Sequence, residues 1–238
     1  MWLIAEYRPV GLFSLKHALA TSSGGKSLLV PTPFALKMAL LDAAFRLLGI
    51  AQTKAIWPTL RDLPVALRPP ERVVVTNLFT RVLKPRRNPA KPGTPHAGPL
   101  GKTIAFREYV WSEGGLGIAL KMVEDDQLAS VTELLLQINY LGKRGGFVQL
   151  LHPPKTADDL PMGYVRLNPV DNQTAFDSRG LLQMLDDCGP KMTFEHADIY
   201  NSKRITLGKE RILHHVVLPY RLVRSSKSYS FYERIDTL

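Results

Sequence analysis

The sequence predicts an α+β protein in which strand–helix–strand units build one antiparallel sheet and a long, basic hairpin projects from it. Three observations carry this prediction: the succession of apolar patterns over residues 2–151, a Pro- and Gly-rich stretch between two strand-like runs near residues 72–108, and an excess of 31 Lys and Arg over 21 Asp and Glu. A chain of 238 residues that is 45% apolar can bury a core of ordinary size. We expect one domain or two closely packed halves.

Strand and helix patterns alternate in the first part of the chain. Thr32 followed by Pro33 predicts the start of a helix, and Gly49 is a suitable left-handed cap for its end. The predicted elements, in order, are a strand at 2–7, this helix, a strand at 72–79, its partner at 103–111, a strand at 116–123, a helix at 127–138 and a strand at 147–151. This is a ferredoxin-like βαββαβ core with a hairpin inserted between its second and third strands.

The residues after His152 predict a β-rich extension. The pattern at 178–187 predicts a capped helix that ends before Gly189, and two later runs, at 212–217 and 229–234, predict strands. The predicted division is therefore a ferredoxin-like domain over 1–151, with its hairpin at about 72–108, and a C-terminal extension over 152–238.

Charge is segregated along the chain, whose formal net charge is +10. Residues 72–108 hold eight basic and one acidic side chain, residues 201–234 hold eight and two, and residues 112–200 hold seven and thirteen. Such segregation favours one or two contact faces for an acidic partner. We expect nucleic acid and no membrane, because no apolar run reaches the roughly 18 residues that span a bilayer.

Motifs for other chemistries are incomplete. The GGKS run at 24–27 lacks the earlier glycine of a phosphate-binding P-loop, because Ala20 stands there. His214 and His215 face opposite sides of a predicted strand, and the acidic pairs at 125–126, 158–159 and 186–187 suit helix ends and loops. Cys188 is the only cysteine, which excludes a disulfide framework and indicates a reducing cytoplasm. We expect no metal and no cofactor.

Two glycine-bearing loops and the hairpin carry the candidate RNA contacts. Glycines on both sides of Lys143 and Arg144 let the backbone approach an anion that two cations neutralise, although the same run also suits a simple helix cap and turn. The complete set of candidate RNA-binding residues is Lys16, His17, Lys26, Lys84, Arg86, Arg87, Lys91, Arg107, Gly142, Lys143, Arg144 and Gly145.

Two further interpretations stay open at this point. Phe79, Phe106, Tyr109 and Phe147 can stack on bases, but aromatic residues in strands more often belong to a core. His17 beside Lys16 has the residue types of a metal-independent endoribonuclease, because RNA cleavage needs a proton acceptor and a cation near the phosphate.

Four segments resemble the CRISPR-associated Cas-five family of the RAMP superfamily. GLFSLK at 11–16 and SLLVPTPFALKMALLDAAF at 27–45 resemble the family's opening, and TNLFTRVLK at 76–84 with FREYVW at 106–111 looks like the two flanks of its thumb hairpin. LGKRGGF at 141–147 stands where a glycine-rich loop is found in such RNA-binding proteins.

The resemblance implies a non-catalytic subunit of a type I Cascade complex that holds the 5′ handle of the crRNA and caps the backbone filament. The implied partners are the crRNA, the Cascade backbone subunit, the large subunit and, in the assembled complex, target DNA. One subtype of the family cleaves the precursor crRNA, so processing of that RNA is the alternative function.

Overall fold

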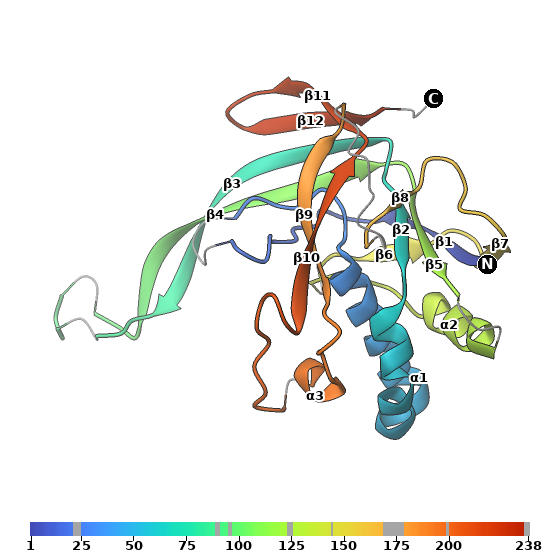
Figure 1. Cartoon of the computed structure of the whole chain (residues 1–238). Helices are drawn as coiled ribbons and strands as arrows, with labels where there is room; N and C mark the ends of the chain where they lie inside the picture. Colours follow the sequence, from blue (N-terminus) through green and yellow to red (C-terminus); the bar gives the residue numbers. More distant parts are fainter. Residues whose placement is uncertain are drawn as a thin grey trace.

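The computed structural model describes residues 1–20, 25–88, 91–94, 97–122, 126–143, 145–168, 179–198 and 200–235. These residues form a mixed α/β structure with antiparallel sheets (Figure 1). In this part of the chain no helix combines the length and the apolar character needed to cross a membrane.

The main sheet is built from both halves of the predicted strand–helix pattern. Its order is β6 (Val148–Leu150), β1 (Trp2–Pro9), β5 (Leu116–Lys121), β2 (Val65–Arg68) and β8 (Val165–Arg166), with β7 (Lys155–Ala157) also paired to β1. Every pair is antiparallel. Helix α1 (Pro33–Asp62) connects β1 to β2, and α2 (Asp126–Leu136) connects β5 to β6.

Alternation along β1 places its two sets of side chains on opposite faces of this sheet. Leu3, Ala5 and Tyr7 lie in the large core with the helices, while Trp2 and Ile4 belong to a smaller cluster on the other face. The buried Tyr7 hydroxyl donates to the carbonyl oxygen of Leu135 at 2.7 Å, which ties the central strand to α2, and burial raises the pKa of this phenol.

Helix α1 begins as predicted and continues further than predicted. The Thr32 hydroxyl accepts from the backbone N–H of Ala35 at 3.1 Å, and Gly49 has a left-handed φ of 74°. The expected end of the first helical segment at Gly49 is therefore confirmed, and a second helical segment that the sequence patterns did not predict follows the kink. Trp57 and Leu60 of the second segment are 2% and 0% exposed, and their burial against the core stabilises a segment that contains a proline.

The second strand of the main sheet differs from the prediction. It is β2, which lies in a stretch between Trp57 and Pro70 that the sequence patterns did not mark as a strand. The predicted run at 72–79 belongs instead to β3 (Arg72–Pro85), which pairs with β4 (Leu100–Glu113). Their register is unbroken from Arg72 opposite Glu113 to Pro85 opposite Leu100, so the predicted pairing of the two runs is confirmed. Figure 1 shows this hairpin curving away from the body.

The last part of the chain joins the rest through strands. The predicted helix at 178–187 is wrong, because β9 (Leu181–Cys188) pairs in register with β10 (Arg211–Leu218), and residue 178 lies outside the described residues. The short α3 (Phe194–Ala197) lies between these strands in the sequence. The predicted strands at 212–217 and 229–234 are confirmed as β10 and β12 (Tyr229–Arg234). Strand β12 pairs with β3 on one side and with β11 (Tyr220–Ser225) on the other.

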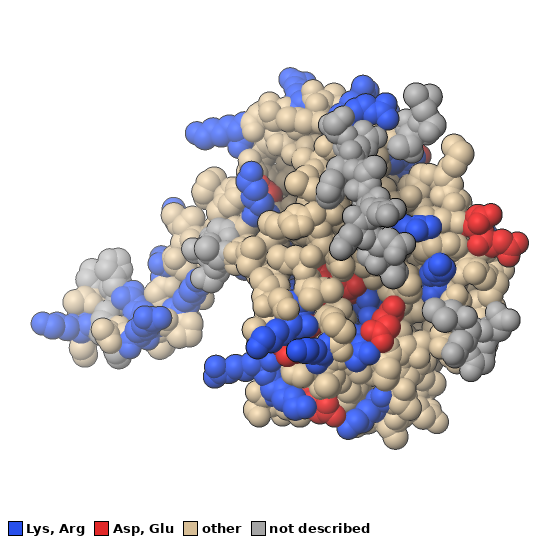
Figure 2. All heavy atoms as spheres, viewed as in Figure 1, with Lys and Arg blue, Asp and Glu red and all other residues tan. Residues whose placement is uncertain are grey.

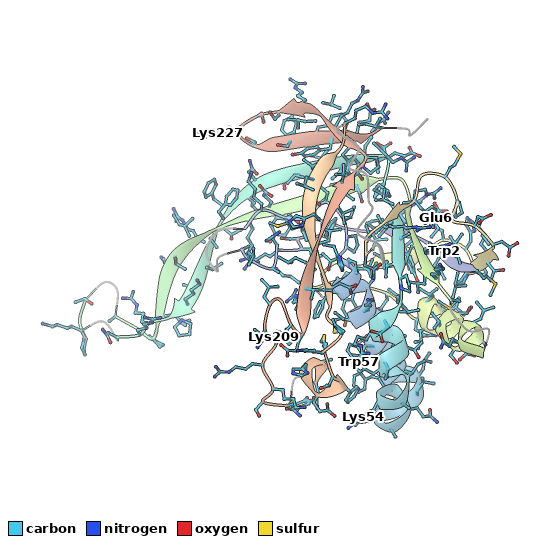
Figure 3. All side chains as sticks on the ribbon, viewed as in Figure 1. Trp2, Glu6, Lys54, Trp57, Lys209 and Lys227 are labelled. Carbon is cyan, nitrogen blue, oxygen red and sulfur yellow. The ribbon has the colours of Figure 1, made fainter. Side chains whose placement is uncertain are left out.

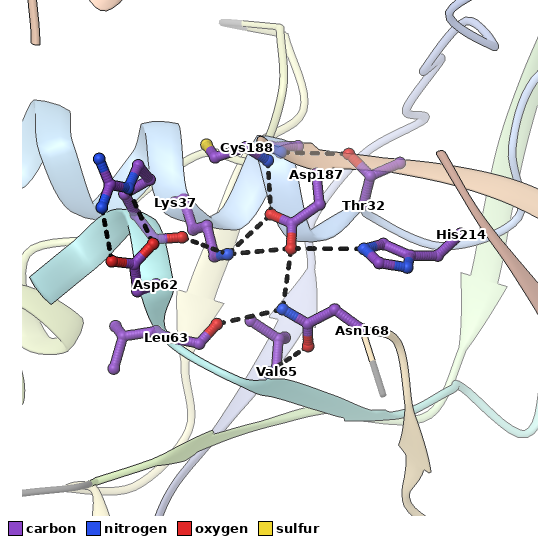
Figure 4. A network of polar contacts seen from close by, with 11 residues as sticks. Thr32, Lys37, Asp62, Leu63, Val65, Asn168, Asp187, Cys188 and His214 are labelled. Atoms are coloured by element: carbon purple, nitrogen blue, oxygen red, sulfur yellow. Dashed lines mark hydrogen bonds and ion pairs between the residues drawn. The ribbon is translucent and has the colours of Figure 1, made fainter. Parts of the chain in front are cut away.

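A buried polar network fixes β9 against α1 (Figure 4). Lys37 is 1% exposed, and its ammonium group lies 2.7 and 3.0 Å from the two carboxylate oxygens of Asp187 and 2.6 Å from the carbonyl oxygen of Arg61. Asn168 donates to Asp187 and to the carbonyl oxygen of Leu63. The network thus joins the end of α1, the connection from α1 to β2 at Leu63, and β9.

The second acidic residue of the pair is also buried and paired. Asp186 is 2% exposed and accepts from Arg211 of β10 at 2.6 Å. The expectation that Asp186 and Asp187 cap a helix end is therefore wrong. His214 lies inside, 3.8 Å from Asp187, whereas His215 is exposed, so the predicted opposite orientation of the two imidazoles is confirmed.

Replacing Lys37→Met should lower the free energy of unfolding by about 3–5 kcal/mol, because Asp187 is then left buried without its counter-charge. The matched control is Lys54→Met. The ammonium group of Lys54 pairs with Glu195 on the surface, so this substitution should lower the free energy of unfolding by less than about 1 kcal/mol. Urea unfolding followed by circular dichroism measures both, and equal losses in the two variants would contradict this role of the buried pair.

Candidate nucleic-acid interface

The polar loop between β1 and α1 is fastened to β4. The backbones of Phe13 and Val110 exchange hydrogen bonds of 3.0 and 2.7 Å, and the N–H of Ser27 donates to the Glu108 carboxylate at 2.7 Å. Lys16 and Ser27 form an isolated β-bridge, so the loop also closes on itself. These contacts hold Lys16 over the base of the hairpin.

The glycine-rich loop before β6 is a tight turn that touches the first loop. Gly142 has a φ of 74°, and a Cβ atom there would lie 2.8 Å from a methyl carbon of Leu15. A Cβ on Gly146 would lie 2.6 Å from the carbonyl oxygen of Leu141. The two glycines therefore permit both the turn and its close approach to the first loop.

Three predicted cations converge where these segments meet. The pKa of Lys143 is lowered, first by burial of its ammonium group and then by the charges of Arg107 and Lys16. We call Lys16, Arg107 and Lys143 the loop cluster; they come from the first loop, from β4 and from the glycine-rich loop. Mutual repulsion in this cluster is relieved when an anion binds between the cations.

The other candidate residues lie around this cluster and along the hairpin. Lys26 and Gly145 are exposed, and Arg144 lies outside the described residues. Lys84, Arg87 and Lys91 are exposed toward the end of the hairpin. Arg86 is partly occupied, because its Nε donates to the carbonyl oxygen of Leu100 at 3.2 Å. Figure 2 shows Lys and Arg side chains at the far end of the projecting hairpin.

Two of the four aromatic candidates are exposed. Phe79 is 72% and Phe147 is 55% exposed, whereas Phe106 and Tyr109 are partly buried. The rings of Phe79 and Phe106 contact each other with a centroid distance of 5.2 Å. The core interpretation is therefore wrong for Phe79 and Phe147, whose rings are free to stack.

Sequence patterns missed two cations of the hairpin and one carboxylate of the site. Arg81 and Lys102 are exposed on the hairpin. Glu108, on the same face of the hairpin, is 8% exposed and binds Ser27. Side chains alternate between the two faces of a strand along 72–85 and 100–113. This alternation could have placed all three residues on the hairpin surface, but only once the pairing register of the two strands was known.

The imidazole of His17 lacks the free ring nitrogen that a general base needs. Its Nδ1 accepts from the backbone N–H of Leu19 at 3.1 Å, and its Nε2 is buried without a hydrogen-bond partner among the described residues. A neutral ring that accepts at Nδ1 carries its proton on Nε2, so neither nitrogen offers an available lone pair. Within the described ranges no group of three or more His, Cys, Asp or Glu side chains is placed to hold a metal ion.

Replacing Lys143→Gln should raise the free energy of unfolding at low salt, because burial and two neighbouring cations disfavour the charged form of Lys143 in the folded protein. The gain should shrink at high salt, where the repulsion is screened. Denaturant unfolding at two salt concentrations measures this. The control Lys121→Gln, at an exposed position of β5, should change stability by less than about 0.5 kcal/mol, and a destabilised Lys143→Gln variant would contradict the repulsion.

Sequence comparison finds one curated relative. The chain is 24% identical to the CRISPR-associated protein Cas5 of Archaeoglobus fulgidus over 163 residues, which are 66% of this chain and 68% of the relative. No family model matches the chain.

Among solved structures, a CRISPR protein from Archaeoglobus fulgidus aligns with a TM-score of 0.49 and 16% identity over 98% of this chain and 92% of its own. A chain of a CRISPR RNA-guided surveillance complex aligns with a TM-score of 0.49 and 15% identity over 91% and 88%. This chain is thus similar in sequence to a CRISPR-associated Cas5 protein, a member of the family that its motifs resemble.

Proposed function

We propose that this chain is a non-catalytic, RNA-binding subunit of a type I CRISPR Cascade effector, which holds the 5′ handle of the crRNA and caps the backbone filament. The proposal rests on the packing of Gly142 against Leu15 and on the hydrogen bond from Ser27 to Glu108, which bring together the three segments that carry Lys143, Lys16 and Arg107. A cluster of cations beside loops and exposed rings suits a single strand, because it neutralises phosphates while leaving bases free to be read.

The strand order supports a ferredoxin-like core for this subunit. The order β6-β1-β5-β2, antiparallel throughout and with one helix in each of the two crossovers, is the arrangement expected of a split βαβ fold. In this interpretation the β3–β4 hairpin is the thumb. Its exposed cations, Arg81, Lys84, Arg87 and Lys102, give it affinity for phosphates without sequence selectivity.

Handle recognition is assigned to the loops at 14–27 and 141–147. The loop cluster binds phosphates there, and Phe147, in the same turn as Lys143, offers a ring to an unstacked base. Phe79 offers a second ring at the start of the projecting part of the hairpin. Two exposed rings beside phosphate-binding cations would hold unstacked bases, which is how single-stranded RNA is read.

The arrangement of His17 speaks against RNA cleavage. A general base needs a free lone pair within hydrogen-bond reach of the 2′-hydroxyl, and the Nδ1 of His17 is already used by the backbone of Leu19. Lys16 and His17 therefore serve phosphate contact and loop structure in this proposal. The partners proposed are the crRNA, the backbone and large subunits of Cascade and, through the complex, target DNA.

Replacing Arg107→Ala together with Lys143→Ala should weaken binding of a 5′-labelled repeat RNA about tenfold or more. It should also reduce the slope of log affinity against log salt by about 1.4, because two phosphate contacts to a single strand are lost. Fluorescence anisotropy measures both quantities. The control Arg224→Ala with Lys227→Ala removes two exposed charges of the β11–β12 hairpin and should leave RNA binding unchanged.

The same titrations separate handle recognition from general RNA binding. An unrelated single strand should compete poorly with the repeat RNA, and RNA copurified with the assembled complex should carry one defined 5′ end. Equal competition, or equal loss of binding in the two double variants, would remove the support for handle recognition.

Replacing Phe79→Ala should weaken binding of the same RNA about fivefold to 150-fold, which corresponds to the roughly 1–3 kcal/mol of one base stacked on an aromatic ring. Phe79→Tyr keeps the ring and should restore most of the affinity. Because Phe79 is largely exposed, the unfolding midpoint of both variants should stay close to that of the original protein. Equal weakening by Ala and Tyr would show that no base stacks there.

A further inference from the structure

A second basic surface lies on the body, apart from the loop cluster. It is formed by the exposed side chains of Lys191, Lys203, Arg204 and Lys209, which flank α3 and lead into β10, and we call it the α3 patch. Figure 3 shows Lys209 and, on α1, Lys54 at the same end of the molecule as α3. Figure 2 shows Lys and Arg side chains gathered over this end.

The acidic groups near the α3 patch are already engaged. Glu195 of α3 pairs with Lys54 at 2.8 Å and with Lys203 at 3.7 Å, and the hydrogen bond from Lys54 lowers the pKa of this carboxyl to about 2. Glu210 accepts from the backbone N–H of Thr206 at 3.0 Å. No acidic side chain in the described part of the chain forms an ion pair with the remaining three residues of the patch, Lys191, Arg204 and Lys209.

The segment that carries most of the patch is ordered by local hydrogen bonds. Asp198 accepts from the backbone N–H of Tyr200, and Asn201 accepts from that of Lys203 at 3.0 Å. The turn at 206–211 closes around Gly208, whose φ is 89°, and its N–H donates to the carbonyl oxygen of Arg211 at 2.6 Å. Side chains of the segment are thus presented to solvent from a defined backbone.

The residue types of this segment match one class of ligand. Tyr200, Asn201, Ser202, Lys203 and Arg204 follow one another, and all are exposed. Tyr, Asn, Ser, Lys and Arg are the side chains that contact the phosphates of duplex DNA and fix a protein's position on it. Tyr200, 93% exposed, is the sole aromatic residue among the described positions 200–210, whereas surfaces for single strands set several rings in a row.

We propose that the α3 patch is a second nucleic-acid site, which binds the phosphate backbone of double-stranded DNA without reading its sequence. The site is separate from the loop cluster and does not depend on the RNA function proposed above. A duplex carries one negative charge for every 1.7 Å or so of its axis, so a short, exposed segment with several cations can contact one backbone from outside the grooves.

Affinity for an unrelated 24-base-pair DNA duplex, measured by anisotropy with the full chain, tests the proposal. Arg204→Ala with Lys209→Ala should weaken duplex binding about tenfold and reduce the salt slope by about 1.8, because two contacts to duplex phosphates are lost. Neither side chain forms a hydrogen bond or ion pair with another residue that the structure describes, so the variant should keep its unfolding midpoint.

The matched control is Arg224→Ala with Lys227→Ala, which removes the same charge from the β11–β12 hairpin and should leave duplex affinity unchanged. Repeat RNA measured in parallel should bind the Arg204 and Lys209 variant as it binds the original protein. The proposal is overturned if the original protein does not bind the duplex, if both double variants weaken it equally, or if the patch variant loses RNA and keeps the duplex. Loss of RNA binding in the Arg107 and Lys143 variant with duplex binding intact would support two independent sites.

Discussion

The fold of this chain depends on the ion pair that Lys37 and Asp187 make in its interior. Removing an ammonium and a carboxylate from water is expensive, and the expense is offset here because the carbonyl oxygen of Arg61 and the amide of Asn168 complete their hydrogen bonds. The pair connects helix α1 to strand β9, and β10 is paired to β9. The chain then returns through β11 and β12, which support the base of the hairpin. The buried pair thereby ties the two-stranded β9–β10 sheet to helix α1, which shares the core with the main sheet.

A second buried carboxylate organises the candidate interface. Glu108 lies on the hairpin strand β4 and accepts from the backbone of Ser27, so an acidic side chain at the centre of a basic surface serves to hold a loop in place. The pKa of Lys143 is lowered by burial of its ammonium group and then by repulsion from Arg107 and Lys16. Sites that bind anions commonly keep such unfavourable repulsion in the free protein, because the ligand removes it.

Sequence periodicity predicted the elements whose stability is local. The capped start of α1, the left-handed Gly49 and the hairpin were all found, because a cap, a positive φ and a β-branched run each leave a signature within a few residues. Strand β2 was missed, since four residues between proline-rich segments give too short a pattern. Strand β9 was taken for a helix because a capping residue precedes the run and Gly189-Pro190 follows it. The partners of its two buried acidic residues, Lys37 and Arg211, lie far away in sequence.

The candidate site was predicted in its residue types and only partly in its geometry. Lys16, Arg107 and Lys143 were each chosen as cations, but their convergence depends on the packing of Gly142 against Leu15, which no local pattern reports. The exposure of Phe79 and Phe147 likewise depends on tertiary packing, because it is decided by which neighbouring segments cover the two rings. Arg86, in contrast, was chosen for its charge and proves to be tied to the backbone of its own hairpin.

The attachment of the hairpin determines how it can move. Strand β12 pairs with β3 only from Arg72 to Thr76, and the last support is the N–H of Asn77, which donates to Ser228 at 2.8 Å. Beyond this point the arm is a two-stranded ribbon of about eight residue pairs, some 26 Å long at the usual rise per residue. The base of this ribbon is therefore supported by β12, whereas no further strand pairs with the outer part of β3 and β4. The length of this ribbon is therefore free to change during evolution without disturbing the core, so that the reach of the arm and the stability of the fold are separate properties.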